Sequence, residues 1–107
     1  MKIVTIEGKW PGTVKLYDPQ TLDQEAAWEY ALAGFRKAID NGGGAGAVHG
    51  ALLPGIFANV AEWNLEGFPK DVTRETFPTR PRKSRDFLIK TLVDAITEIY
   101  KQDDPNE

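Results

Sequence analysis

The stretch TLDQEAAWEYALAGFRKAID, residues 21 to 40, decides the fold class, because its apolar residues recur with the period of an amphipathic helix. Thr21 suits an N-cap, and Asp23 and Glu25 favour the positive N-terminal end of a helix. Two apolar strips are predicted along it, one of Trp28, Leu32, Phe35 and Ile39, and a second of Leu22, Ala26, Tyr30 and Ala33. Glu25, Glu29, Arg36 and Asp40 form the polar face.

On the C-terminal side, NGGGAG at 41–46 is predicted to end this helix, since Asn and Gly accept the left-handed conformation of a helix C-cap. This glycine run lacks the GK[ST] element and the strand–helix setting of a phosphate-binding loop. We therefore interpret it as a flexible linker between two helices. The following segment, ALLPGIFANVAEW, keeps helical spacing, and Pro54 is tolerated in a first turn, so a short helix is expected over 54–62.

The last apolar pattern, SRDFLIKTLVDAITEIYK at 84–101, predicts a second long helix that begins at Ser84. Its buried stripe is expected to hold Leu88, Leu92, Ile96 and Ile99, flanked by Ile89 and Ala95. Asp86 and Lys90 have the i,i+4 spacing of a surface ion pair. The acidic residues 103–107 are expected to form a frayed tail.

Upstream, KIVTIE and TVKLY alternate in polarity and predict two strands, and GKWPG between them supplies turn residues. The predicted fold is therefore a mostly α-helical α+β domain. An N-terminal β-hairpin packs on two long amphipathic helices and one short helix, in a single domain over 1–107.

The composition excludes several classes of site. The chain has 107 residues, no cysteine and a net charge of −3, which rules out disulfides, zinc–thiolate sites and thiol catalysis. The net charge does not indicate a whole-surface affinity for nucleic acid or anionic membrane. No apolar run approaches the length that spans a bilayer, and the N-terminus does not have the pattern of a signal peptide or a membrane anchor.

Catalytic, cofactor-binding and metal-binding residues are not predicted. His49 has no convergent partner near it in sequence and is interpreted as a loop histidine after the glycine run. The carboxylates show neither a metal-loop spacing nor a pairing with a nucleophile. The basic segment RPRKSR at 80–85 is interpreted as a solvated lead into the last helix, and contact with phosphate is the alternative.

The connection EWNLEGFPKDVTRETFPTRPRKSR at 62–85 is long and holds aromatic and proline residues, which suggests a partner-contact surface over 62–78. The candidate contact residues are Trp63, Leu65, Phe68, Phe77 and Trp10. For Trp10, which lies in the predicted hairpin turn, packing on the core and exposure at an interface are both open. The same two interpretations apply to the loop as a whole.

The order of these features resembles the small tail assembly chaperones of long-tailed phages and prophages. The resemblance rests on LYDPQTLDQEAAWEYAL, on LLPGIFANVAEWNLEGFP, on ETFPTRP and on a closing helix that ends ITEIYK. It covers most of the chain, and EWNLEGFP with the Phe77–Pro78 pair is its most specific part. The glycine-rich segment and RPRKSR do not match a feature of that family.

The resemblance implies a non-enzymatic role in the host-cell cytoplasm, without cofactors. Such chaperones bind the apolar tape measure protein together with copies of themselves, present it to the tail tube subunits, and are absent from the mature virion. The alternative is a structural virion component, such as a head–tail adaptor or minor tail protein. A third hypothesis is a small nucleic-acid-binding regulator that uses Arg80, Arg82, Lys83 and Arg85.

Overall fold

The computed structural model describes residues 1–102, and the predicted acidic tail at 103–107 lies outside the described residues. The elements follow the order β1, β2, α1, α2, β3, α3. Their bounds are Lys2–Ile6 for β1, Gly12–Leu16 for β2, Leu22–Asp40 for α1, Ala45–Asn59 for α2, Val60–Leu65 for β3 and Arg82–Gln102 for α3. The predicted fold class, a mostly helical α+β fold, is confirmed.

The sheet has three antiparallel strands in the order β1-β2-β3. The predicted hairpin of β1 and β2 is confirmed, and Val4 pairs with Val14 at its middle. The third strand, β3, was predicted as helix and loop, and that prediction is wrong. Its Trp63 pairs with Val14 of the central strand, so the start of the long connection is part of the sheet.

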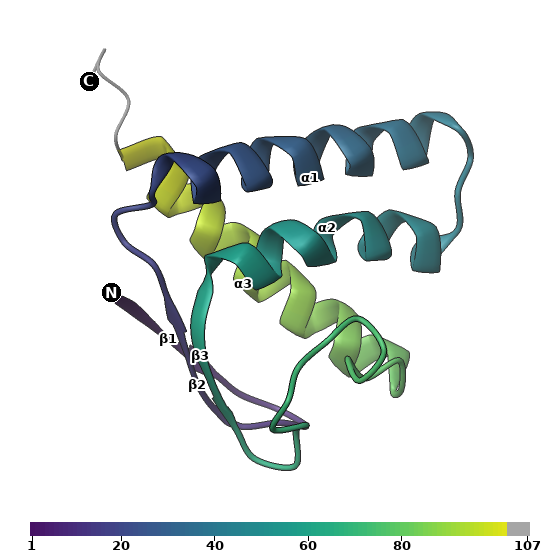
Figure 1. Ribbon diagram of the computed structural model, residues 1–107. Coiled ribbons are helices and arrows are strands. Elements are labelled where there is room, and N and C mark those ends of the chain that lie inside the picture. The colour runs from purple at the N-terminus through teal and green to yellow at the C-terminus, as the bar shows by residue number, and fades with distance from the viewer. Residues whose placement is uncertain (103–107) are drawn as a thin grey trace.

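The helices α1 and α2 form an antiparallel hairpin, and α3 crosses beside them with the sheet on its other side (Figure 1). The core lies where α2 and α3 meet the sheet and α1. Its largest fully buried side chains include Trp28, Leu16, Ile56, Leu92 and Ile96. The predicted buried stripe of the last helix is confirmed, because Leu88, Leu92, Ile96 and Ile99 are all at most 1% exposed.

The predicted short helix over 54–62 is wrong, since α2 is longer, begins nine residues earlier at Ala45 and ends at Asn59. Pro54 lies inside it. A proline in a helix interior removes the bond to the carbonyl four residues back, which here is that of Gly50. The Arg74 Nη1 group donates to this carbonyl at 3.0 Å, so a distant side chain replaces the missing N–H.

The end of α2 is set by Asn59, whose side chain is buried and fully hydrogen-bonded. Its Nδ2 donates to the carbonyls of Gly55 at 2.8 Å and Gln24 at 3.3 Å, and its Oδ1 accepts from Gln20 at 2.7 Å. The backbone turns extended at Val60, with ψ 121°, and joins the sheet. The hydrogen bonds of Asn59 therefore fix the point where α2 ends and β3 begins. The hydrophobic spacing of the sequence had favoured a helix that continues to residue 62.

The first long helix agrees with its predicted start and differs in its exposed face. Thr21 caps α1 in a capping box with Gln24, as the N-cap prediction required. Trp28 is buried, but Ile39 at the end of the same predicted strip is 51% exposed. The second predicted strip faces solvent, with Leu22 80% and Tyr30 83% exposed. No helix among residues 1–102 has the length and apolar content to cross a membrane.

Candidate functional site

Five aromatic rings form one cluster beneath the long connection, and we call it the aromatic cluster. Its members are Trp10 of the β1–β2 turn, Phe57 of α2, Trp63 of β3, and Phe68 and Phe77 of the connection. Phe68, Trp63 and Phe77 each contact three other rings of the cluster. Phe68 stacks on Trp63 with ring centroids 5.4 Å apart and meets Trp10 and Phe77 edge-on at 5.6 and 5.8 Å. Such pairs add stability beyond the area they bury.

The connection between β3 and α3 is tied down along its length. The Glu66 N–H donates to the Pro11 carbonyl at 2.8 Å, and Arg74 reaches the Gly50 carbonyl. Thr76 Oγ1 accepts from the Thr73 N–H at 2.8 Å, which closes a local turn before Phe77. The connection is therefore an ordered cover over the aromatic cluster, held by hydrogen bonds at its start and in its middle.

Of the five predicted contact residues, two are buried and three are partly exposed. Trp10 is 6% and Phe77 5% exposed, so these two rings pack in the core and have almost no surface left for a partner. Trp63, Leu65 and Phe68 are half-buried, and a contact role for them stays a prediction. Phe57 of α2 also belongs to the cluster and was not predicted as a contact residue; its ring centroid lies 6.4 Å from that of Trp63. Trp63 itself lies in β3, where helix and loop were predicted.

Phe68→Ser is expected to lower the melting temperature, because the change removes one ring from three aromatic pairs. A loss of about 2 kcal/mol is expected from burial and ring packing together, which corresponds to roughly 8–16 °C in a domain of this size. Thermal unfolding followed by circular dichroism measures it, with Lys70→Ser in the exposed part of the same connection as control. Normal melting of Phe68→Ser would contradict the packing role and return the ring to the contact hypothesis.

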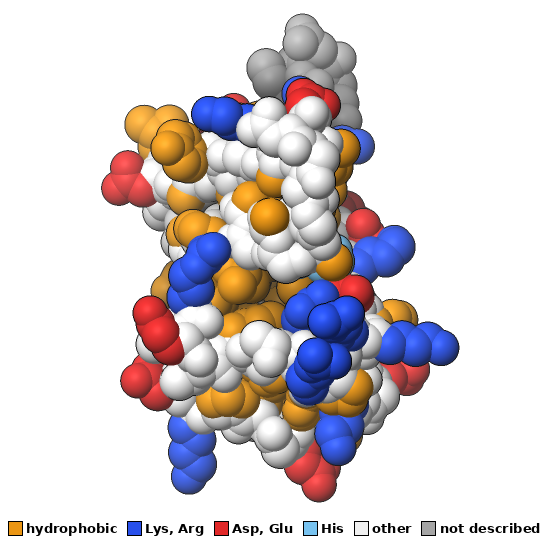
Figure 2. Space-filling view, turned by 90° about the vertical axis from the view of Figure 1, so that its right-hand side faces the viewer, with side chains coloured by type: hydrophobic (Ala, Val, Ile, Leu, Met, Phe, Trp, Pro, Cys, Tyr) orange, Lys and Arg blue, Asp and Glu red, His pale blue; other side chains and the backbone are white. Residues whose placement is uncertain are grey.

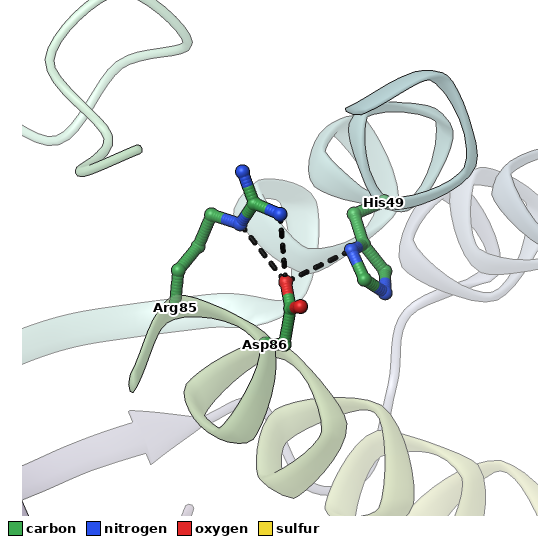
Figure 3. A network of polar contacts seen from close by, with 3 residues as sticks. All are labelled: His49, Arg85 and Asp86. Atoms are coloured by element: carbon green, nitrogen blue, oxygen red, sulfur yellow. Dashed lines mark hydrogen bonds and ion pairs between the residues drawn. The ribbon is translucent and has the colours of Figure 1, made fainter. Parts of the chain in front are cut away.

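Next to the cluster, the side chains of Arg85 and His49 converge on one carboxylate oxygen of Asp86 (Figure 3). Asp86 Oδ1 lies 2.9 Å from both Nε and Nη2 of Arg85, and 3.0 Å from His49 Nδ1. The histidine contact has an ion-pair distance without hydrogen-bond alignment, although Nδ1 is buried. Since only 12% of the Arg85 side chain is exposed, Asp86 serves as its counter-charge.

This network corrects two predictions. His49 is a residue of α2, where a loop was predicted, and its partner Asp86 belongs to α3. The predicted Asp86–Lys90 pair is wrong as well, because Lys90 pairs with Asp94 at 2.8 Å.

A histidine beside a carboxylate is also part of catalytic triads, but no hydroxyl nucleophile is bonded to His49 within residues 1–102. The contact between His49 and Asp86 joins α2 to α3.

Two hollows open on either side of His49. The larger, which we call the three-helix groove, has a volume of about 370 Å³. Its apolar lining comes from Phe35 of α1, Leu52 of α2 and the α3 residues Ile89 and Val93, with His49, Asp86 and Lys90 along its polar side. The smaller, about 120 Å³, has Arg74 and Arg85 at its margin and Leu53 and Phe77 among its apolar lining.

Figure 2 shows the face that carries the α1–α2 turn and the long connection. The surface is hollowed between these two parts, with hydrophobic side chains on the floor and a group of Lys and Arg side chains at one margin. Of the four cations in the nucleic-acid hypothesis, Arg85 is already neutralised by Asp86. The remaining three, Arg80, Arg82 and Lys83, are exposed.

Among the described residues 1–102, no group of three or more His, Asp or Glu side chains is placed to hold a metal ion. No protein-family description, no curated protein and no solved structure matches this chain.

Proposed function

We propose that this protein is a non-enzymatic assembly chaperone that binds an apolar, helical client. Following the resemblance of its sequence, the client is the tape measure protein of a phage or prophage tail. The observation that carries the proposal is the three-helix groove, whose lining from three different helices is mainly apolar and open to solvent. A groove between helices is a common seat for the apolar face of an amphipathic partner helix.

The groove has a chemistry that suits such a client. Phe35 and Val93 are only partly buried, so their apolar surface gains from being covered. The charged side chains Asp86 and Lys90 stand at its border, where they can meet polar residues on the rim of a bound helix. A client helix that buries its apolar stripe here no longer presents it to other copies, which opposes aggregation.

Val93→Trp tests this function by filling the groove with a larger side chain. The indole has room to extend into the groove, so folding is expected to persist while a client helix is excluded. We expect at least roughly a tenfold loss of affinity for the client, equal to about 1.4 kcal/mol. The measurement is the soluble fraction of the tape measure protein on co-expression, followed by titration with a soluble client fragment.

The matched control is Lys101→Trp, the same new side chain at an exposed position of the same helix. Unimpaired solubilisation by a folded Val93→Trp variant would refute the groove as the client site. Failure of the unchanged protein to solubilise the tape measure protein would refute the function itself. Recovery of the protein in purified phage particles would instead favour the structural virion component.

A further inference from the structure

The outer face of α1 carries an apolar stripe that nothing in the described chain covers. Leu22 and Tyr30 are 80% and 83% exposed, and Ala26 and Ala33 are exposed between and after them. The spacing of four, four and three residues places them on one face, opposite the buried Trp28 and Ala31. The buried Trp28 and Ala31 face Gly55 of α2, so the stripe points away from α2. In Figure 1, α1 runs along one edge of the molecule with α2 beneath it.

The charges beside the stripe are divided between the two halves of the helix. Asp23 and Glu25 lie in the first turn, and Arg36 and Lys37 lie towards the other end. None of these four side chains makes an ion pair within residues 1–102. Glu29, on the same helix, already has a partner within the chain. It accepts a hydrogen bond from the Tyr100 hydroxyl at 2.6 Å, and this bond raises the pKa of Tyr100.

This division is self-complementary when two copies of α1 run antiparallel. Asp23 precedes Tyr30 by seven residues and Lys37 follows it by seven, so a two-fold axis at Tyr30 sets Asp23 of one copy opposite Lys37 of the other. At 3.6 residues per turn, Asp23 and Lys37 share one flank of the stripe, while Glu25 and Arg36 share the other. A parallel arrangement would instead set acid against acid and base against base.

The small side chains in the stripe favour close approach of two helices. Ala26 and Ala33 stand on either side of Tyr30, and Gly34 borders a shallow hollow of about 200 Å³ together with Tyr30, Ala33 and Lys37. The two-fold arrangement places the alanines of one copy against those of the other and leaves each hollow next to a ring of the partner. The apolar stripe, the placement of the charges and the antiparallel direction all suit the same partner, which is α1 of a second copy of this chain.

We infer that the outer face of α1 is a homodimer interface, in which the α1 helices of two copies pair antiparallel about a two-fold axis near Tyr30. The inference does not depend on the proposed client, since the three-helix groove lies on the other side of α1 and stays open in such a dimer. The interface is small, because one helix from each copy forms it, so the dimer is expected to exchange with monomer.

Charge reversal tests the pairing and its direction. Asp23→Lys with Glu25→Lys makes the face basic throughout, and Arg36→Glu with Lys37→Glu makes it acidic throughout. Each double variant alone is expected to dimerise at least about tenfold more weakly, because like charges face each other. The two mixed together are expected to form a heterodimer, and the variant with all four changes is expected to recover homodimerisation.

Sedimentation equilibrium measures the association constants, and circular dichroism melting verifies that every variant is folded. Tyr30→Asp provides a second disruption, with Ile3→Asp, an exposed apolar residue of β1, as its matched control. An unchanged protein that is monomeric up to its solubility limit overturns the inference. So do folded double variants that dimerise normally, or a mixture that forms no heterodimer.

Discussion

Leu92→Asp is expected to unfold the domain at room temperature. Leu92 is 0% exposed at the middle of the α3 stripe, between Leu88 and Ile96, so the new carboxylate would be shut off from water within the hydrophobic core. Large-to-small changes at such sites cost about 2–5 kcal/mol, and an unpaired buried charge adds several more. Since a domain of this size is stable by about 5–15 kcal/mol, most or all of the stability is lost.

The matched control is Phe87→Asp, which introduces the same charge five residues earlier on α3 at a side chain that is 56% exposed. It is expected to change the free energy of unfolding by no more than about 1 kcal/mol. Circular dichroism and urea unfolding of both variants measure the contrast. A Leu92→Asp variant that melts normally would mean that this stripe faces solvent, and would make it a candidate binding surface in place of the groove.

The long helices were predictable because their signal is local. The N-cap at Thr21 and the buried stripe of α3 depend on spacings within one helix, and both agree with the structure. The outward direction of the Leu22–Tyr30 strip was not predictable in the same way. The first long helix has two apolar strips and only one is covered, which depends on where α2 packs.

The region from 45 to 65 was mispredicted because distant residues decide it. Pro54 stays inside α2 with Arg74, twenty residues later, bonded to the Gly50 carbonyl. Val60 and Trp63 continue the helical spacing of Leu52 and Ile56, yet they lie in β3, since β2 offers a strand edge there. The candidate site has the same origin: the three-helix groove and the His49–Asp86 contact exist only after α1, α2 and α3 have packed.

The close packing of α1 against α2 predicts opposite effects for two glycine-to-alanine changes. A Cβ at Gly55 would lie 2.5 Å from the Ala31 Cβ and 3.0 Å from Trp28 Cε3, both in the buried face of α1. A Cβ at Gly34, also in a helix, would meet only the Ala51 Cβ at an ordinary 3.7 Å. The first change therefore overpacks the helix pair, whereas the second adds helix propensity without a clash.

Gly55→Ala is expected to destabilise the protein by about 1–3 kcal/mol, because the two helices must move apart at their tightest point. Gly34→Ala is expected to stabilise it by up to about 1 kcal/mol, the difference in helix propensity between the two residues. With roughly 4–8 °C per kcal/mol, melting at low protein concentration separates the two variants clearly from the unchanged protein. If Gly55→Ala melted as high as Gly34→Ala, the helices could not be in the close contact described, and Trp28 would have to lie elsewhere than beneath α2.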